Sequence, residues 1–542
     1  MRLFYIGFML FVLGNCFTAT AQQMIPVQGK DSVSYFIIRQ ADRLRFQKLD
    51  STELNILAGH VIMEQGKTIF YCDSAVVNKT KKIVEAFGSV HINDNDSVHI
   101  YSQYLIYHLD TKVAEVRKKV TMTDGKGTLT SEELQYDSKS RTGVYTTGGK
   151  IVNGKTIITS KEATYYADMK DVYFKRDVKL RDPSYNLDTD SLLYNTDTQI
   201  STFITKTKIT DSSGGNIVTT EGNYDMKNKR ATFGKRSVIQ DGKGVTVTGD
   251  NIYTDDSTGN TIITGNGVYV DTVQKVSILS NRMEANKKTG KFMATQHPLM
   301  IIQQDKDSTY ITSDTMYSAK VADLHDSLYQ DLPRDTITSK VVVNAKDTAE
   351  LRYFQCFHHV RIFSDSMQAV CDSLFYTARY SVFRLYKNPI VRANNSQVMG
   401  DTMYLYTRNR KPDRMYVFYD GMAINKSDTG QYNQMSGRTL NAYFKDGGMD
   451  YMRAKGSAQS VYYAKDEHDA MIGVNNASAD IIDMKYENKK LQKVIYRSDV
   501  TGTMYPVSQL PDDKKQLRNF KWLDDKRPKT KYELFEDPGT QN

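Results

Sequence analysis

The sequence has little proline, a single tryptophan and few cysteines. Its 542 residues include 10 Pro, one Trp and four Cys. Proline far below the usual level of about 5% argues against proline-rich linkers and collagen-like structure. Four cysteines in so long a chain are too sparse for a disulfide framework. After the N-terminus, no apolar run approaches the roughly 20 residues of a membrane-spanning helix. These absences exclude a polytopic membrane protein and a disulfide mini-domain.

The residues that are abundant favour strands. The chain has 36 Tyr and many Thr, Ser and Val, while hydrophobic residues amount to only 39%. β-branched and aromatic residues are enriched in strands. Charged residues make up 25% of the chain, which is ordinary for a folded protein and does not indicate a disordered polymer. The composition therefore predicts a large β protein with a polar surface.

The N-terminus predicts export. Arg2 precedes an apolar run over residues 3–13, and Ala19-Thr20-Ala21 resembles a cleavage site. This pattern is typical of a secretory signal, so we expect residues 1–21 to be removed and the mature protein to be exported. An uncleaved anchor and a lipoprotein attached through Cys16 are the alternatives.

Three cysteines remain after the predicted signal: Cys72, Cys356 and Cys371. Cys356 and Cys371 flank a predicted hairpin, so either a cross-strand disulfide or two buried free thiols is compatible with their spacing, and the thiols are favoured. The formal net charge of +9 is dispersed along the chain, without a basic arm or a stacking motif, which argues against a nucleic-acid partner. No cofactor is expected.

Internal repetition is the strongest signal. The phrase "apolar, any, small, Asp, apolar, Tyr" recurs, as in residues 187–194, 311–317 and 370–376. The anchor positions are Asp73, Gln103, Glu132, Lys161, Asp190, Glu221, Asp250, Asn281 and Asp314, which are separated by 29 to 33 residues, and Asp372 and Asp401 continue the series. We expect the small residue before the anchor to lie where two walls of strands approach closely.

A second phrase places two apolar residues two positions apart, which puts both on one face of a strand. The pairs proposed to line an apolar groove are Val90 and Ile92, Val120 and Met122, Val178 and Leu180, Val268 and Val270, and Met422 and Ile424. Polar turns such as Asn153-Gly154 separate the phrases, as hairpins require. Because one unit cannot bury its apolar face alone, neighbouring units must stack.

The predicted fold is all-β: an elongated, repeat-built jelly roll or solenoid of two facing, mostly antiparallel sheets with units of about 30 residues. The expected organisation is a signal at 1–21, a β-repeat domain at 40–320, an insertion or joint at 321–350 that begins with a short helix, a second β-repeat stretch at 351–505, and a charged, loosely held tail at 506–542.

No motif predicts an active site. Residues 149–156 match the P-loop pattern, but β-branched residues follow where a helix is needed. A carboxylate that recurs in nearly every unit is more simply a turn or surface residue than a catalytic group. His358 and His359 are adjacent and point to opposite strand faces, which suits one zinc ion poorly. Neither a catalytic residue nor a metal ligand is proposed.

The alternation of Phe87-Gly-Ser-Val-His-Ile92 with Ile100-Tyr-Ser-Gln-Tyr-Leu-Ile-Tyr107 resembles the OstA/LptA-like family of periplasmic lipopolysaccharide-transport domains. The resemblance covers about residues 40–500 and is clearest over 55–320. It implies a twisted jelly roll whose apolar interior carries acyl chains, edge-to-edge joining of like domains, and inner- and outer-membrane transport components as partners. This chain is much longer than a single-domain member.

The resemblance favours a non-enzymatic bridge or chaperone that shields lipopolysaccharide acyl chains during outer-membrane assembly. A closed β-solenoid with a structural or adhesive role is the alternative, and a polysaccharide-acting enzyme on a β-helix is a remote one. The three hypotheses differ in the interior, which is open in the first, packed in the second, and interrupted by polar residues at one level in the third.

Overall fold

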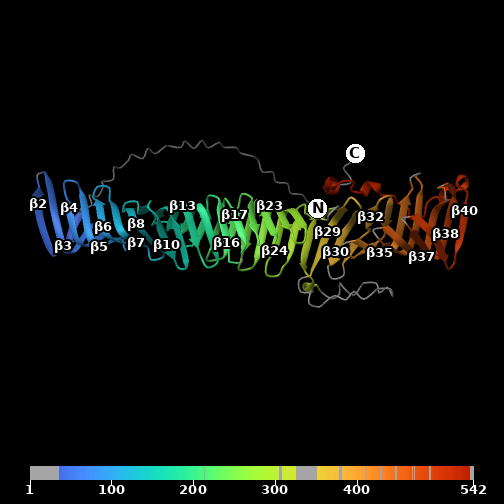
Figure 1. Ribbon diagram of the computed structural model, residues 1–542, viewed down its shortest axis with the longest axis horizontal. Coiled ribbons are helices and arrows are strands. Elements are labelled where there is room, and N and C mark those ends of the chain that lie inside the picture. The colour runs from blue at the N-terminus through green and yellow to red at the C-terminus, as the bar shows by residue number, and fades with distance from the viewer. Residues whose placement is uncertain are drawn as a thin grey trace, which may run out of the picture.

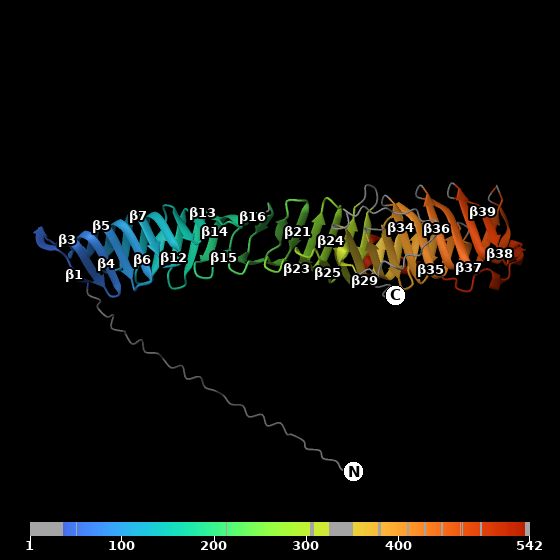
Figure 2. The same cartoon turned by 90° about the horizontal axis from the view of Figure 1, so that it is seen from below.

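The computed structural model describes residues 36–536 except 50, 213, 304–307, 325–350, 378–380, 409–410, 428–429, 446–447, 467, 469 and 488–489. The predicted signal and most of the predicted joint lie outside this part. The described chain is a long, narrow molecule whose strands cross its long axis, with the N-terminal strands at one end and the C-terminal strands at the other (Figures 1 and 2). The all-β prediction is confirmed.

The strands follow one another in chain order. The first fourteen are β1 (Phe36–Gln40), β2 (Arg43–Leu49), β3 (Thr52–Gln65), β4 (Thr68–Asn78), β5 (Ile83–Asp94), β6 (Val98–His108), β7 (Val113–Thr123), β8 (Thr128–Asp137), β9 (Thr142–Tyr145), β10 (Gly149–Asn153), β11 (Thr156–Ser160), β12 (Glu162–Tyr166), β13 (Asp171–Arg181) and β14 (Tyr185–Asn195). The next fourteen are β15 (Ile200–Phe203), β16 (Thr207–Asp211), β17 (Asn216–Thr219), β18 (Gly222–Asp225), β19 (Arg230–Phe233), β20 (Ser237–Gln240), β21 (Val245–Gly249), β22 (Asn251–Asp255), β23 (Asn260–Asp271), β24 (Val276–Asn286), β25 (Phe292–Thr295), β26 (Leu299–Ile302), β27 (Thr309–Thr312) and β28 (Thr315–Lys320).

The remaining strands are β29 (Arg352–Phe363), β30 (Gln368–Thr377), β31 (Val382–Tyr386), β32 (Ile390–Ala393), β33 (Ser396–Met399), β34 (Thr402–Arg408), β35 (Lys411–Lys426), β36 (Tyr432–Lys445), β37 (Gly448–Lys465), β38 (Met471–Glu487), β39 (Lys490–Arg497) and β40 (Thr501–Tyr505). Short 3-10 turns complete the described chain: η1 (Val321–Asp323), η3 (Val507–Gln509), η4 (Asp512–Lys514), η5 (Asp524–Lys526) and η6 (Lys531–Phe535).

A corner in the middle of each long strand folds the sheet on itself. In β5, two residues with positive φ, Gly88 (70°) and Ser89 (40°), interrupt the pairing between Phe87 and Val90. Such a bulge bends a strand and re-aims the side chains that follow it. The same interruption recurs along the chain, at Lys118-Lys119 in β7 and at Arg176-Asp177 in β13. The two predicted sheets are therefore two walls of one continuous antiparallel sheet.

We name the walls by β5: residues 83–87 belong to wall A and residues 90–94 to wall B. Side chains that point between the walls form the main hydrophobic core, whose largest fully buried members include Phe70, Phe174 and Tyr136. Alternate residues point to solvent, which gives the alternating burial of β5 and its neighbours. The core therefore runs lengthwise between the walls.

Small residues line wall B beside the corner, as the anchor phrase predicts. Cys72, Ser160 and Gly249 are buried there. Across the interior they meet large side chains of wall A: the hydroxyl of Ser160 lies 2.7 Å from that of Tyr145. A Cβ atom on Gly249 would lie 2.4 Å from Cγ2 of Ile263. The narrow space at the corner explains why the repeat keeps a small residue at this position.

Gly249→Ala is expected to destabilise the protein by about 1–3 kcal/mol, because overpacking a filled core forces neighbouring side chains or backbone to move. Gly234→Ala is the matched control, since its added Cβ would have no neighbour closer than 3.8 Å. Urea unfolding of both variants measures the difference. Equal stabilities for the two variants would contradict the close approach of the walls at the corner.

The sheet continues without interruption past the predicted joint. Tyr310 of β27 pairs with Phe363 of β29, and Met316 of β28 pairs with Cys356 of the same strand. The strands before and after residues 325–350 are therefore neighbours in one sheet. The residues expected to begin a short helix form the single turn η1, and the rest of that segment lies outside the described residues.

The three cysteines are buried free thiols, as favoured above. Burial raises the pKa of the Cys72 and Cys371 thiols to about 12. Burial likewise raises the pKa of Cys356, which is fully enclosed. Since the thiolate is the reactive form, these groups are inert packing residues.

The C-terminal segment, residues 506–536, differs from the loosely held tail that was expected. It turns back from β40 and lies along the outside of wall B; in Figure 1 it is the red stretch above β32. Leu510, Leu517 and Trp522 pack against side chains of the sheet. Apolar residues that pack on the sheet alternate with the charged residues of this segment, so its charge content by itself did not predict that the segment docks.

Candidate functional site

Six of the ten proposed groove residues lie in a tightly packed part of the core. Val90, Ile92, Val120, Met122, Val178 and Leu180 all point between the walls and are at most 2% exposed. Every inward position from β3 to β15 in the main core is similarly enclosed. We call this part the closed section. Its interior leaves no room for a ligand between these side chains.

Tyrosines latch the closed section along the side opposite the corner, which we call the seam. Tyr107 of wall A donates a hydrogen bond of 2.8 Å to Gln65 of wall B. One repeat later, Tyr136 donates to Asp94 at 2.5 Å. Buried hydroxyls need such partners, because an unpaired one loses its hydration without compensation. Each bond joins the two walls, so the tyrosines hold the seam shut.

The next latch has a pH-dependent partner. Tyr165 donates to Asp124 at 2.6 Å. Burial raises the pKa of the Asp124 carboxyl, but hydrogen bonds from Tyr165 and from the backbone amides of Gly127 and Lys126 outweigh it, so the pKa lies below its usual value. A depressed pKa stabilises the fold above the unfolded-state value of about 3.9, and this contribution is lost as the pH falls through the folded-state pKa.

Tyr165→Phe should therefore make the protein more sensitive to acid. Without the donor, the pKa of Asp124 rises, and we expect the midpoint of acid unfolding to move to higher pH. Circular dichroism followed from pH 6 to pH 2 measures the midpoint. Tyr166→Phe, next to it on β12 but on the outward face, serves as the control. An unchanged midpoint in Tyr165→Phe would show that the latch contributes nothing.

Beyond β15 the walls are no longer closed at the seam. Inward-facing apolar side chains that pack on the core are only partly buried there: Ile217, Tyr224, Ile239, Val247, Tyr269, Val276, Phe292 and Ile302. We call the part from β17 to β28 the open section. The residues next to the corner remain buried, as Phe233 and Ile263 show. The open section therefore has a buried floor at the corner and partly exposed, inward-facing apolar side chains at the seam.

The opening has a local cause in the sequence. The position of the latch tyrosines can be followed from strand to strand by cross-strand pairing. From Tyr194 it passes through Ser201 to Tyr224, and then through Ala231 to Thr254. Further pairing leads to Thr261 and then to Ala285. Tyr224, the first of these residues in the open section, still contacts Tyr185 of wall B, with 4.8 Å between the ring centres. The latch position after it is occupied by Thr254 and Ala285. Neither side chain can reach across to wall B, so the inward residues near the seam stay uncovered.

The sequence contained a signal for the latch that the repeat phrase obscured. Tyr136, four residues after the anchor Glu132, points inward, whereas Tyr253, three residues after Asp250, points outward. Tyr224 departs from this spacing, since it lies three residues after Glu221 and points inward. The strand period is two, so a shift of one residue reverses the face.

The prediction that Val268 and Val270 face the interior is wrong. The corner of β23 is Gly265-Asn266, both with positive φ, and pairing resumes at Gly267. The residue next to the corner is therefore Gly267, and Tyr269 points inward in the position that Ile92 has in β5. Val268 and Val270 are partly exposed on the outer face. Because the strand period is two, an error of one residue in placing the corner assigns the side chains that follow it to the wrong face.

Met422 and Ile424 also lie outside the interior. The corner of β35 is Tyr419-Asp420, and Gly421 is the first residue after it. Both apolar side chains are only 1% exposed, because the C-terminal segment covers them on the outer face of wall B. Their prediction as groove residues is wrong for the same reason of register.

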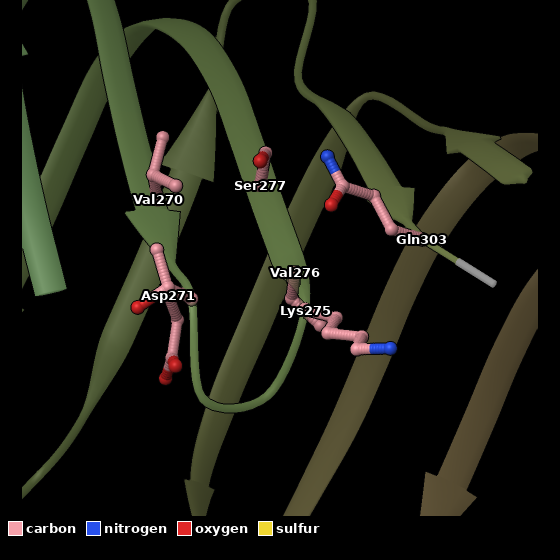
Figure 3. A pocket seen from close by; sticks show the side chains of 7 residues that line it. Val270, Asp271, Lys275, Val276, Ser277 and Gln303 are labelled. Carbon is pink, nitrogen blue, oxygen red and sulfur yellow. The ribbon is translucent and has the colours of Figure 1, made fainter. Parts of the chain in front are cut away.

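A surface pocket adjoins the open section at the tip of the β23–β24 hairpin (Figure 3). Its volume is about 280 Å³. Val270 and Asp271 come from one strand, Lys275 and Val276 from the other side of the turn, and Gln303 from the adjoining loop. The pocket is smaller than most ligand sites, which span about 300–1,000 Å³, and its lining provides one carboxylate and one ammonium group. We assign it no chemistry of its own.

The recurrent carboxylates lie on the outer side of the corner. Asp314 contacts His359 at 2.9 Å, and Asp372 contacts His358 at 3.3 Å and Lys387 at 3.1 Å. These exposed pairs contribute little to stability. The two adjacent histidines thus bind different carboxylates, one in the bend between β27 and β28 and one on β30. In the described part of the chain, no group of three or more His, Cys, Asp or Glu side chains is arranged to hold a metal ion.

The P-loop-like residues form the hairpin of β10 and β11, with Asn153 pairing with Thr156 across the turn. The helix that phosphate binding requires is therefore replaced by a strand.

Within the ranges described above, no helix has the length and apolar character needed to cross a membrane.

Comparison with known proteins adds one finding. No curated protein sequence matches the chain. Residues 33–190 match the OstA-like protein family. The match spans β1 through most of β14, which includes most of the closed section, and the same corners and pairings continue through the open section. Over residues 33–190, the chain is similar to OstA-like proteins.

Proposed function

We propose that this protein is a non-enzymatic periplasmic bridge or chaperone that shields the acyl chains of lipopolysaccharide on their way to the outer membrane. One observation carries the proposal: from β17 to β28, apolar side chains that point between the walls are uncovered along the seam. A groove of this kind can take a flexible acyl chain lengthwise. The OstA-like region supports a role in lipid transport.

The closed section and the open section have different roles in this proposal. The closed section has no interior space, so it acts as a rigid spacer, which is the role that a closed solenoid would have. The open section receives the lipid. Burial of acyl CH₂ groups contributes about 0.8 kcal/mol each, so even a partly enclosed chain binds without any charged partner in the groove. Neither ATP nor a cofactor takes part in binding.

The N-terminal end offers a surface for joining another β-sheet. β1 and β2 each pair with β3. Leu44 and Phe46 of β2 occupy inward rows but are 47% and 68% exposed at this end. An exposed strand edge with an apolar face recruits a further strand. We propose that a transport component at either membrane, or a second copy of this chain, joins here.

Photo-crosslinking in cells tests the proposal. A photoreactive amino acid replaces Ile239 or Tyr269, which point inward, or Val238 or Val268, their outward neighbours. We expect the inward pair to capture lipopolysaccharide and the outward pair to remain unlabelled. Equal labelling from both faces would refute a groove between the walls, and labelling from neither would refute lipid transport by this section.

A further inference from the structure

The outer face of wall B carries a groove that holds a polypeptide segment. One cross-strand row runs over six strands, β32, β33, β35, β36, β37 and β38. It consists, in order, of Arg392, Gln397, Ile424, Gln434, Val461 and Asn476. Elsewhere this face points to solvent, yet Gln397 and Gln434 are only 0% and 2% exposed. The C-terminal segment lies over this row.

The buried carboxamides of Gln397 and Gln434 form hydrogen bonds with the backbone of that segment. Gln434 donates to the carbonyl of Lys515 at 2.8 Å and accepts from the amide of Leu517 at 2.8 Å. Gln397 does the same: it donates to the carbonyl of Lys521 at 2.6 Å and accepts from the amide of Leu523 at 3.0 Å. A side-chain carboxamide carries both N–H donors and a carbonyl acceptor, so it can bind the carbonyl of residue i and the amide of residue i+2 of any peptide. These contacts recognise a peptide backbone without regard to its sequence.

Apolar and aromatic contacts add preference for particular side chains. Leu517 and Phe520 enter a cluster that contains Met422 and Ile424. The indole of Trp522 stacks under the guanidinium of Arg392, 4.3 Å from the ring centre, which in turn contacts Asp524 at 3.1 Å. The groove therefore accepts a segment with bulky apolar residues spaced like 517, 520 and 522.

The segment is attached in a way that permits release. Its contacts with the sheet use side chains, including Asn476 to the carbonyl of Lys514 and Arg361 to that of Glu533. Its own backbone hydrogen bonds are local, as from Phe520 to Leu517 and from Arg527 to Asp524. It adds no strand to the sheet, so its departure leaves every β-pairing intact.

We propose that this row is a peptide-binding groove which the chain's own C-terminal segment occupies in the resting state, and which takes a segment of similar chemistry from a partner protein when the chain's own segment leaves. The inference stands on the outer face alone and is independent of lipid binding between the walls.

Peptide exchange tests the groove directly. The variant Leu517→Ala/Trp522→Ala weakens docking of the chain's own segment and removes its sole tryptophan. A synthetic peptide of residues 507–536 then carries the only indole in the mixture. We expect this peptide to bind the variant, with a blue-shifted emission. Labelled peptide should bind the unaltered chain at least about tenfold more weakly, because its groove is occupied.

Groove variants provide the matched comparison. Adding Gln434→Ala should weaken peptide binding about tenfold, whereas adding Gln459→Ala, an exposed glutamine of β37, should leave it unchanged. Absence of peptide binding to a folded double variant would overturn the proposal. Dimers of the unaltered chain that grow with concentration would instead identify a second copy as the donor and overturn the assignment to a partner protein.

Hydrogen exchange of the unaltered chain gives a test that does not depend on any variant. The amides of Leu517 and Leu523 should exchange faster than those of β35 and β36, because the segment opens on its own. Exchange only through global unfolding would make the segment a permanent part of the fold and overturn its role as a replaceable ligand.

Discussion

Ile239→Asp is expected to weaken lipid binding by the open section strongly while leaving the protein folded. Ile239 points between the walls, pairs with Ile217 and Val247, and is partly exposed. A carboxylate there would have to lose its hydration when an acyl chain covers it. We expect a cost of about 2 kcal/mol or more, which corresponds to roughly thirtyfold weaker binding.

Val238→Asp is the matched control for this experiment. It introduces the same charge one residue away on β20, on the outer face of the wall. Titration with fluorescent lipopolysaccharide compares the two variants with the unaltered protein. Binding that falls equally in both would mean that the lipid contacts the surface rather than the groove, and binding that survives in Ile239→Asp would place the lipid elsewhere.

Asp94→Ala should produce the largest loss of stability, about 3–5 kcal/mol, because it removes one partner from a buried charged network. The Asp94 carboxylate is 4% exposed. It accepts hydrogen bonds from Tyr136 at 2.5 Å and Thr68 at 2.8 Å and lies 4.0 Å from Nε of Arg141. The truncation leaves the hydroxyls of Tyr136 and Thr68 buried without their acceptor and removes one of the carboxylates beside Arg141, which keeps Asp168 at 3.0 Å. Urea unfolding at neutral pH measures the loss.

Two companion variants separate the latch from the turn that holds it. Asp96→Ala changes an exposed carboxylate two residues away that bonds only locally, to Asn93, and should alter stability by less than about 0.5 kcal/mol. Tyr136→Phe removes the hydroxyl alone and should cost about 1–3 kcal/mol. If Asp94→Ala were no worse than Asp96→Ala, the seam would not depend on its latches.

Much of the fold was predictable because the repeat reports local geometry. Hairpin turns, strand alternation and the small residue at the corner each leave a short-range pattern, and Cys72, Ser160 and Gly249 all lie where that pattern places them. The recurrent carboxylates were predicted as surface groups, and Asp314 and Asp372 lie on the outer corner.

Register limited the prediction of the groove residues. Val90 and Val178 follow the corner directly, whereas Val268 and Met422 stand one residue further from it. The same short phrase therefore points inward in two strands and outward in two others. Only the position of the positive-φ pair distinguishes them, and glycine marks that pair in some strands but not at Tyr419-Asp420.

By itself, the sequence determined an all-β chain of stacked units of about 30 residues, because neighbouring residues set turns, strand faces and repeat length. Tertiary structure decided where the interior closes and where it opens, since a latch joins residues about 42 positions apart, as Tyr136 and Asp94 are. It also decided the docking of residues 506–536 on wall B, where Gln397 meets Leu523 across 126 positions. Contacts over such distances depend on how many units intervene and how they twist, which no local pattern records.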